Sequence, residues 1–564
     1  MLRLAPWLIA ALLVGPILAG LAMAALPAFG YLPALGGDAF SLDPWRALMT
    51  QPGLARSVAI SFISGLATTA VSLAVVLLFL AAASGSRLDR WIRRMVSPLL
   101  SIPHAAAAFG LAFLIAPSGL LARFASPALS GWERPPDLLI VNDPWGLSLM
   151  AGLVIKEIPF LLLMSLAALH QLDAERRVAM ARSLGYRPTI AWLKVVVPSL
   201  YPLIRLPVFA VIAYASSVVD VAMILGPTLP PTLAVSILTW FNDPDLSRRF
   251  MASAGALLQL GVTLAALASW WGLECVVRRL GRGWVAGGQR QRGERALRLA
   301  GKALILLAAA TALVGIAGLA LNSLAGVWRF PDGLPQTFTL QHWQRALPAL
   351  GGPVAATLMI ASTATLLAVG LVLAALEHEQ RSGRQPAQGR LTSALTLLYL
   401  PLIVPQIAFL FGLVVVMEAL GTRPTRWLVI FGHLLFVLPY VFLSMSEAYR
   451  RFDPRWSRVA LTLGATPNGA FWRVRLPMLL APLLTAMAVG LAVSIGQYLP
   501  TLLLGAGRVP TVTTEAVALA SGGNRRLIGV WALVQASLPL LGFIIAVGLP
   551  RLLWTNRRGM RGTP

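Results

Sequence analysis

Long apolar runs separated by short polar segments make up nearly the whole chain. Many of the runs reach about 20 residues, the length with which an α-helix crosses the roughly 30 Å hydrocarbon core of a bilayer. The pattern predicts twelve membrane-spanning helices, six in each half of the chain. The predicted spans are residues 7–29, 56–83, 97–116, 145–169, 199–226 and 251–277, then 303–325, 353–376, 394–419, 426–447, 478–504 and 527–553. The expected fold is an all-α polytopic membrane protein.

The two halves repeat each other. Pro103 and Gly110 in the third predicted span match Pro405 and Gly412 in the ninth, with the same spacing in each half. Because each repeat has six spans, an even number, both repeats should run in the same direction through the membrane. Parallel repeats of this kind are related by a pseudo-two-fold axis along the membrane normal.

The chain therefore divides into two repeats and a connection. We expect the first six-span repeat at residues 1–277 and the second at 303–564. Residues 278–302 are rich in Arg and Gly, a composition typical of a flexible linker. A basic segment that anchors the neighbouring spans on the cytoplasmic side is an equally simple interpretation.

Charge supports the membrane assignment and sets a topology. The 564 residues are 57% hydrophobic and 12% charged, with a formal net charge of +25. Such a charge can indicate nucleic acid, but here Lys and Arg gather in alternate loops, as the positive-inside rule expects. We therefore expect a lipid bilayer as the environment and no nucleic acid. The same bias predicts that both termini are cytoplasmic.

Several kinds of chemistry find no support in the sequence. The single Cys275 excludes a disulfide framework. Gly301-Lys302 lacks the upstream Gly and the following Ser or Thr of a Walker A motif, so ATP is not bound by that route. We find no nucleophile motif and no cluster at metal-ligand spacing. His104, His170 and His433 lie in different parts of the topology, and we predict no metal site.

Two short basic stretches, on predicted cytoplasmic loops 170–198 and 448–477, repeat most clearly. In each, a Pro follows the Gly after three residues and another Pro stands ahead of the next span. The matching residues are Ala179, Ala181, Gly185, Pro188 and Pro198 in the first stretch, and Arg458, Ala460, Gly464, Pro467 and Pro477 in the second.

These residue types suggest a short docking helix at the membrane surface. Ala179, Ala181 and Ser183 would form a thin helical face for another protein's groove. Gly185 would end the helix with positive φ, as a C′ residue does, and Pro188 would not extend it. We expect Leu184, Trp192 and Val195 to pack the segment against the bundle. Such a helix, attached rigidly to two spans, would transmit movement from a partner.

The stretches A-M-A-R-S-L-G with V-V-V-P, and R-V-A-L-T-L-G-A with R-L-P, resemble the cytoplasmic loop of ABC importer permeases. In that family the loop usually begins E-A-A, followed by three residues and Gly. Here Ala179 and Arg458 replace the leading Glu in the two copies. The layout over almost the whole chain is similar to the fused permeases of ferric-iron and thiamine importers.

The resemblance implies a function that the residue pattern does not give. It implies the permease subunit of an importer in the bacterial inner membrane, and not an enzyme. Two copies of a separate ATPase would grip the two loops and bind ATP and Mg²⁺, with no cofactor in this chain. A periplasmic binding protein would deliver the solute. The direction of transport follows only from the resemblance, and the sequence does not name the solute.

Two other classes are compatible with twelve spans. An ion-coupled secondary transporter needs no ATPase and would transport by itself in proteoliposomes. An integral-membrane enzyme needs a catalytic cluster near an interface.

Polar residues within the predicted spans are candidates for the translocation pathway. Charged groups in the hydrocarbon usually face a cavity or a partner. Lys156 and Glu157 lie mid-span, and adjacent residues do not share a helix face. Asp220 and Gln497 lie in spans five and eleven. We expect these four to line the pathway or, alternatively, to form structural pairs between helices. Glu418 is a weaker candidate of the same kind.

Matching arginine pairs occur on the predicted outside loops. Arg248-Arg249 and Arg525-Arg526 each precede the last span of a half. They would contact either acidic patches of a binding protein or lipid headgroups.

Overall fold

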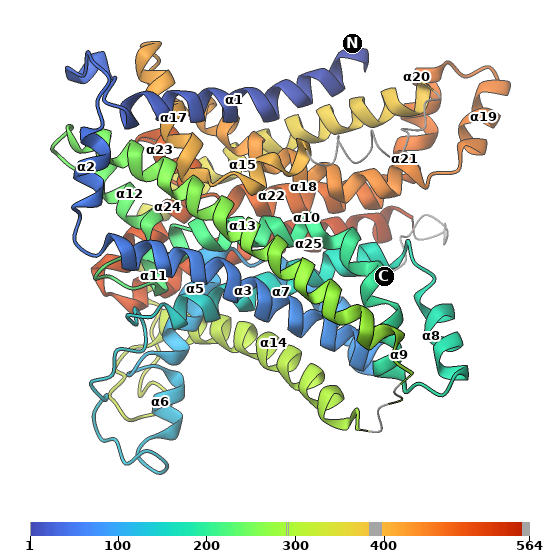
Figure 1. The fold of residues 1–564 in the computed structure, drawn as a ribbon, viewed down its shortest axis with the longest axis horizontal. Helices are drawn as coiled ribbons and strands as arrows, with labels where there is room; N and C mark the ends of the chain where they lie inside the picture. The colour runs from blue at the N-terminus through green and yellow to red at the C-terminus, as the bar shows by residue number, and fades with distance from the viewer. Residues whose placement is uncertain (1, 289, 291–292, 383–396, 555–564) are drawn as a thin grey trace.

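The computed structural model describes residues 2–288, 290, 293–382 and 397–554. Within these ranges the chain is built from helices and short connections, with only two isolated β-bridges and no strand. The helices run roughly side by side and form one elongated bundle (Figure 1). The all-α prediction is confirmed.

The helices of the first half are α1 (Ala5–Ala28), α2 (Asp43–Met49), α3 (Leu54–Ala83), α4 (Arg87–Ser101), α5 (His104–Ile115), α6 (Leu120–Ala125), α7 (Leu147–Leu169), α8 (Ala174–Ser183), α9 (Pro188–Val195), α10 (Val197–Ser217), α11 (Asp220–Leu225), α12 (Leu233–Phe241) and α13 (Arg248–Ala286). Those of the second half are α14 (Arg295–Leu324), α15 (Gln341–Arg381), α17 (Gln406–Ala419), α18 (Arg426–Arg450), α19 (Pro454–Thr462), α20 (Pro467–Ala470), α21 (Leu476–Met478), α22 (Leu480–Ile495), α23 (Leu499–Gly505), α24 (Val512–Ala518) and α25 (Arg525–Leu553). A π-helical turn, Phe471–Arg475, joins α20 to α21.

Ten helices among the described residues are long and apolar enough to span a bilayer, and two bent helix pairs bring the number to twelve. One bent pair joins Leu397–Ile403 to α17 at 95°, and the other joins Pro467–Met478 to α22 at 75°. The twelve fall at the predicted places, six in each half.

The predicted span 97–116 is not one straight helix. The chain breaks at Pro103, and the residues before the break belong to α4, whose Ser86 caps the helix by accepting the Asp89 N–H at 3.2 Å. Pro405 marks the equivalent break before α17. Proline lacks the N–H that would continue the helical ladder, which explains why both breaks fall at this residue.

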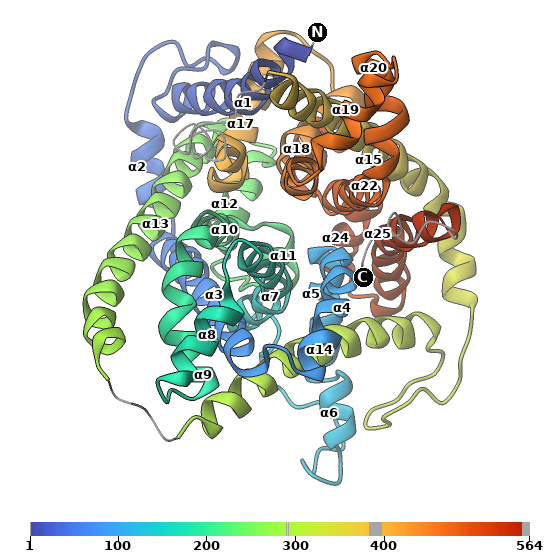
Figure 2. The same cartoon turned by 90° about the vertical axis from the view of Figure 1, so that its right-hand side faces the viewer.

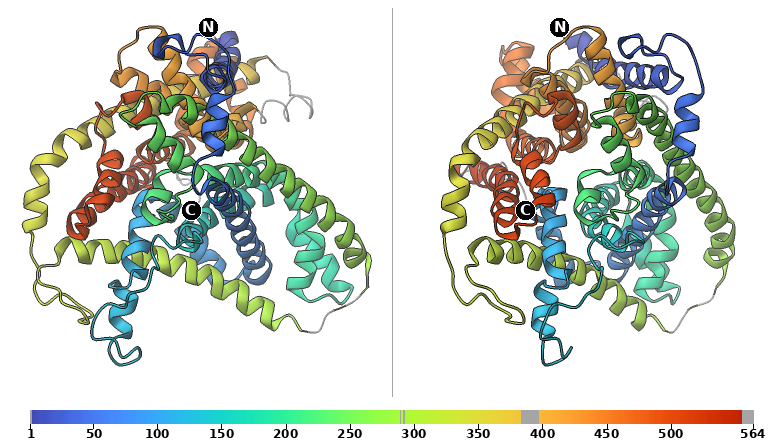
Figure 3. Two further views of the ribbon diagram at one scale, coloured as in Figure 1. Left: turned by 60° about the vertical axis from the view of Figure 1, so that its left-hand side comes forward. Right: turned by 90° about the vertical axis from the view of Figure 1, so that its left-hand side faces the viewer.

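The first helix of each half packs against the opposite half. α1 contacts α15 and α17, while α14 contacts α3 and α5. Figure 3 shows blue α1 beside orange segments of the second half and yellow-green α14 beside blue and cyan segments of the first. The repeats are therefore interlocked rather than separate domains.

Glycine pairs make these cross-half contacts close. A Cβ added to Gly110 of α5 would lie 2.9 Å from the carbonyl carbon of Gly315 in α14. Gly412 of α17 similarly faces the backbone of Gly20 in α1. Small residues at such crossings let helix backbones approach closely in membranes. The repeated Gly110 and Gly412, noted in the sequence, thus lie at the two equivalent crossings.

The fifth span of each half is broken toward the same end. α10 ends at Ser217 and α11 starts at Asp220, while α22 ends at Ile495 and α23 starts at Leu499. Irregular backbone at membrane depth occurs where it is buried in protein or lines a cavity. The predicted continuous spans 199–226 and 478–504 are therefore each a longer helix followed by a short one.

The connection between the halves is shorter than expected. α13 continues to Ala286 and α14 begins at Arg295, so the prediction of a flexible linker over 278–302 is wrong for residues 278–286 and 295–302, which are helical.

The two basic stretches lie at the same end of the bundle. α8 and α9 are found with α19, α20 and α21 on the right in Figure 1, whereas α2, α6 and α12 lie at the opposite end. Viewed onto that end, α8 and α9 lie on one side of the molecule and α19 and α20 on the other (Figure 2). This is the arrangement expected of a pseudo-two-fold axis running between the halves.

Candidate functional site

The first basic stretch ends α8 in a Schellman motif. Gly185 has φ +89°, in the left-handed region where glycine is favoured. Its N–H donates to the Arg182 carbonyl at 2.9 Å, and the Tyr186 N–H donates to the Ala181 carbonyl at 3.3 Å. Pro188 then occupies the first turn of α9. The local geometry expected of Gly185 and Pro188 is present.

The second stretch reproduces this geometry. Gly464 has φ +85°. Its N–H donates to the Leu461 carbonyl at 3.0 Å, and the Ala465 N–H donates to the Ala460 carbonyl at 3.0 Å. Pro467 starts α20, and the Thr466 hydroxyl accepts the Gly469 N–H at 3.1 Å. Two short helices with the same C-terminal cap geometry, α8 and α19, therefore lie at one end of the bundle.

The remaining stretch residues take less uniform positions. Pro198 lies in the first turn of α10 and Pro477 in α21. Ala179 and Arg458 are exposed, Ala460 is half-buried, but Ala181 is only 6% exposed. Ala181 therefore faces the protein and not a partner, contrary to the expected thin face.

Apolar side chains project from both loops. Leu184 is 62% exposed, so the prediction that it packs against the bundle is wrong, whereas Trp192 is 3% exposed and packs inward as predicted. Leu463, the equivalent of Leu184, is 82% exposed. Met180 and Val459, another equivalent pair, are 57% and 53% exposed. The two loops therefore expose apolar side chains at equivalent positions on the outer surface of the bundle.

The connection between the halves holds the first loop. Buried Glu294 accepts the Thr189 N–H of α9 at 3.0 Å. Lys194 donates to the Gly287 carbonyl at 2.7 Å, and its ammonium lies 5.0 Å from the ring centres of both Tyr186 and Trp284. A carboxylate at a helix N-terminus is favourable because the N–H groups there lack partners within the helix. The segment joining the repeats is thus part of the first loop's structure.

A buried ionic cluster holds the second loop. Arg475 of the π-helical turn pairs with Glu377 of α15 and donates to the Ser457 hydroxyl at 3.0 Å. Tyr449 also donates to Glu377, and Arg381 approaches that carboxylate at 2.7 Å. A buried ion pair is stabilising only where further hydrogen bonds satisfy its members, and here the further partners come from three helices, α15, α18 and α19.

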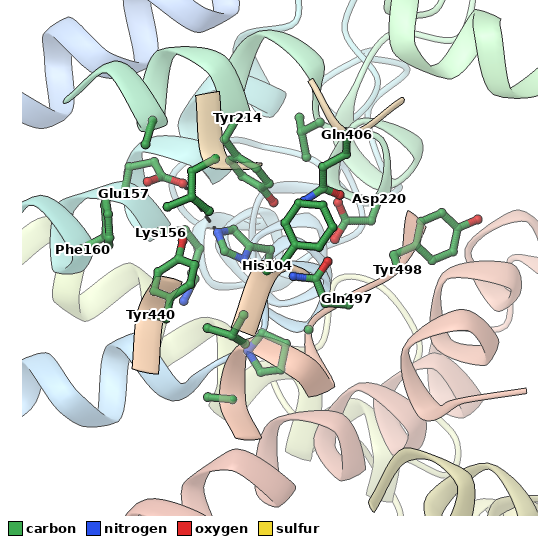
Figure 4. A pocket seen from close by; sticks show the side chains of 18 of the residues that line it. His104, Lys156, Glu157, Phe160, Tyr214, Asp220, Gln406, Tyr440, Gln497 and Tyr498 are labelled. Carbon is green, nitrogen blue, oxygen red and sulfur yellow. Dashed lines mark ion pairs between the residues drawn. The ribbon is translucent and has the colours of Figure 1, made fainter. Parts of the chain in front are cut away.

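A central cavity lies between the halves (Figure 4). All four pathway candidates line it: Lys156, Glu157, Asp220 and Gln497. Lys156 and Glu157 come from α7, Asp220 begins α11, and Gln497 lies in the break between α22 and α23. The broken fifth spans therefore bring residues of both halves to one site.

The Lys156 ammonium is bonded to backbone carbonyls at the wall of the cavity. Its ammonium donates to the carbonyls of Leu99 at 3.3 Å, Leu100 at 3.3 Å and Ile102 at 2.5 Å. These carbonyls end α4, where a cation is favourable because the last carbonyls of a helix have no partner within it. Lys156 thus has the structural role that the sequence left open.

Glu157 lies beside His104 at the start of α5. Its carboxylate oxygen lies 3.5 Å from His104 Nε2, and the His104 ring centre lies 4.8 Å from that of Tyr214. In Figure 4, His104 stands between Glu157 and Asp220. Asp220 is 8% exposed and forms no ion pair with any described residue.

The sequence did not identify the cavity's other polar residues. Gln406 starts α17 after Pro405, as His104 starts α5 after Pro103, so the repeated prolines offered a signal. Tyr440 and Phe160, each following a repeated Pro, lie edge to face across the cavity with ring centres 6.3 Å apart. Tyr214 and Tyr498 carried no repeat signal because Val493 and Val219 occupy the equivalent places.

An N-terminal cap fixes α7. The Asp143 carboxylate accepts the N–H groups of Trp145 at 3.1 Å, Leu147 at 2.8 Å and Ser148 at 2.8 Å. Burial acts to raise the pKa of this carboxyl, but these hydrogen bonds outweigh it and leave the pKa lowered. The equivalent Thr425 of α18 caps more weakly, accepting the Leu428 N–H at 3.4 Å.

Other polar candidates have structural partners. His433 is bonded to Ser494 at 2.7 Å and Thr501 at 2.8 Å, joining α18 to both parts of the broken fifth span. Glu418 lies outside the cavity and pairs with Arg249 at 3.0 Å. In the described ranges, no group of three or more His, Cys, Asp or Glu side chains is arranged to hold a metal ion.

The outside arginines all have partners within the chain. Arg248 pairs with Asp243 at 3.0 Å, and Arg249 with Glu418. Arg525 donates to the Ser118 hydroxyl at 2.7 Å, and Arg526 to the Gly326 carbonyl. They hold loops of the protein together, a role that the sequence did not suggest.

Interlocked parallel repeats, broken spans around a central cavity and paired helices at one end define a membrane transport protein. Two comparisons identify its family. Residues 385–550 match the family described as binding-protein-dependent transport system inner membrane component. The chain is also 32% identical over 526 residues to the inner membrane ABC transporter permease protein YnjC of Escherichia coli K12, covering 93% of each chain.

Relatives with one repeat's length support the same assignment. The putative 2-aminoethylphosphonate transport system permease protein PhnV of Salmonella typhimurium is 28% identical over 241 residues, which cover 42% of this chain and 87% of PhnV. The molybdenum transport system permease protein ModB of Mycobacterium tuberculosis is 27% identical over 180 residues, covering 29% of this chain and 68% of ModB. The chain belongs to the family of binding-protein-dependent ABC transport permeases, and the resemblance seen in the sequence is confirmed.

Proposed function

We propose that the chain carries both permease halves of an ABC importer and that a separate ATPase binds the helices α8 and α19. The supporting observation is that two Schellman-capped helices of one geometry lie at one end of the bundle, on either side of the pseudo-two-fold axis. Two copies of one ATPase would meet equivalent exposed side chains there. The stretch residues around Gly185 and Gly464 are the proposed coupling residues.

The end that carries α8 and α19 is the cytoplasmic end in this proposal, because the basic loops gather there. Both termini would then be cytoplasmic. The opposite end, with α2, α6 and α12, would face the periplasm and receive the solute from a binding protein. ATP and Mg²⁺ would be bound by the ATPase, whose closure would move α8 and α19 and rock the two halves around the central cavity.

Site-specific cross-linking tests the docking. In a Cys275→Ser background, single cysteines replace Met180 or Val459, and the tagged chain is purified from native membranes after treatment with a thiol-to-amine cross-linker. We expect a cross-linked ATPase from both positions. Leu229, which is 86% exposed at the opposite end, is the matched control. An ATPase cross-linked to Leu229, or to neither loop, contradicts the proposal.

A further inference from the structure

The central cavity presents two carboxylates to a solute, while its lysine ammonium is already bonded and its histidine, His104, lies beside Glu157. Two carboxylates line it, Glu157 at 5% exposure and Asp220 at 8%. No arginine lines it in the part of the chain that the structure describes. Its one lysine, Lys156, uses all three of its N–H donors on the carbonyls that end α4. An anionic solute would find no ammonium or guanidinium free to bind it.

Aromatic rings surround these carboxylates. Phe160 and Tyr440 meet edge to face on one side, and Phe436 and Tyr214 line the same space. The face of an aromatic ring attracts a cation, most strongly where water is excluded. A carboxylate near such faces is the chemistry that recognises an ammonium or another organic cation.

The two carboxylates are not equivalent. Glu157 already lies 3.5 Å from His104 Nε2, whereas Asp220 is in no ion pair with a described residue. Asp220 lies at the break between α10 and α11, where the fifth span bends beside the cavity. The Asp220 carboxylate is therefore held at the helix break and faces the space between the two halves (Figure 4).

We propose that this cavity binds a small solute through a positively charged group, with Asp220 as its carboxylate partner and the surrounding aromatic rings as its walls. This assignment rests on the proposed function, because it takes the cavity as the translocation pathway. Glu157 is the second contact, and its pairing with His104 makes its contribution smaller. Gln406 and Gln497, from the other half, supply neutral polar groups to the rest of the solute.

Direct binding to the purified permease in lipid nanodiscs tests the proposal. Tetramethylammonium and ethylammonium chloride are titrated against sodium acetate and sodium methylphosphonate at constant ionic strength, with isothermal calorimetry as the readout. We expect saturable binding of at least one cation and none of either anion. Asp220→Asn should weaken cation binding at least tenfold, and Glu157→Gln by a smaller factor.

Asp245→Asn is the matched control, because Asp245 is an exposed carboxylate on an outside loop and should leave binding unchanged. Size-exclusion profiles verify that each variant is folded. The comparison of cations with anions is made on the wild-type protein, so it does not depend on the folding of any variant. Preferential binding of an anion, no saturable cation binding, or unchanged affinity in Asp220→Asn overturns the proposal. ATPase cross-linking at Met180 and Val459 does not involve the cavity, so failure of the proposed function would be seen separately.

Discussion

The loops at α8 and α19 end in the same way and are held in different ways. Gly185 and Gly464 have φ values of +89° and +85° and the same pair of hydrogen bonds. Around Gly185, the contacts come from the segment that joins the two repeats. Around Gly464, they come from a buried ion pair between the π-helical turn and α15. The two helix caps thus share one geometry, while the contacts that hold the two loops to the rest of the chain differ.

The caps of the two loops are alike, whereas the contacts that hold the loops to the bundle differ, and the proposed docking of a partner accounts for this contrast. In the proposed docking, two copies of one partner would need the same protruding helix at both places, which would constrain the cap. The attachment faces the bundle, where any arrangement that fixes the helix is sufficient. The two loops should therefore respond alike to changes in the cap and differently to changes in the attachment.

The largest effect is expected from breaking the ionic attachment of the second loop. Arg475→Met leaves Glu377 buried without its main cation, which typically costs about 3–5 kcal/mol. Thermal unfolding in detergent should show a clearly lowered midpoint, and hydrogen exchange should increase around α19 and α20 but not α8. Adding Glu377→Leu should recover much of the loss. A single variant as stable as the wild type would contradict the role given to this pair.

A change in either cap should have a smaller effect on stability and a large one on coupling. A side chain at positive φ costs about 1–2 kcal/mol, so Gly185→Glu and Gly464→Glu should each leave an inserted protein with a distorted loop. In vesicles that contain the double variant together with the ATPase, we expect the ATPase to hydrolyse ATP without uptake of solute. Wild-type uptake by the double variant would refute the coupling role of these glycines.

Alanine substitutions at Gly185 and Gly464 distinguish the effect of a changed helix cap from the effect of a changed contact with the rest of the chain. A Cβ at Gly464 meets nothing within 4 Å, whereas one at Gly185 lies 3.3 Å from the Arg290 side chain. Both variants bear the same backbone cost, and only Gly185→Ala must also shift Arg290. Hydrogen exchange near residues 287–290 should therefore rise in Gly185→Ala, while Gly464→Ala should change only its own loop. Equal changes at residues 287–290 in both variants would count against this account.

Loss of the Glu294 carboxylate should weaken the first loop alone. A carboxylate at a helix N-terminus contributes about 1 kcal/mol in a partly buried setting, so Glu294→Ala should raise exchange at Thr189 and its neighbours in α9. Arg381→Ala is the matched control, since Arg381 donates to the side chain of Asn468 in α20 at 3.0 Å. Exchange in α9 that rises equally in both variants would show that the attachments are not local.

The smallest effect concerns pH and the caps of α7 and α18. Because the pKa of Asp143 is lowered in the fold, its stabilisation is present above the ordinary carboxyl pKa and is lost as pH falls through the lowered value. Amide protection at Leu147 should therefore fall in acid, while protection at Leu428, capped by Thr425, should not. Asp143→Asn should abolish this pH dependence. Parallel losses at both helices would assign the effect to a different group.

Much of the fold followed from the sequence because its signals are long or repeated. Twelve apolar runs and the paired glycines Gly110 and Gly412 predicted two repeats of one orientation, and the structure has them, although their interlocking through α1 and α14 was not predicted. The spacing around Gly185 predicted a helix ended by positive φ. Each of these depends on local backbone preferences or on hydrophobic length, which single segments encode.

The rest depended on contacts between distant segments. Nothing near Glu294 indicates that it would cap α9, and nothing near Lys156 indicates that α4 would end beside it. Leu184 was expected to pack inward, yet it follows α8 with 62% of its surface exposed, because no other helix among the described residues covers that end of the loop. Two of the cavity's tyrosines, Tyr214 and Tyr498, lack aromatic equivalents in the other half, so the repeat could not reveal them.

The exchange of first helices between the halves has a consequence for synthesis. Gly20 of α1 meets its partner Gly412 only after most of the chain has been made. At roughly 5–20 residues per second, α1 enters the membrane tens of seconds before α17 exists. During that interval its small-residue face must contact lipid or the insertion machinery. Joining both repeats in one polypeptide then ensures that the awaited helix arrives beside the one already inserted.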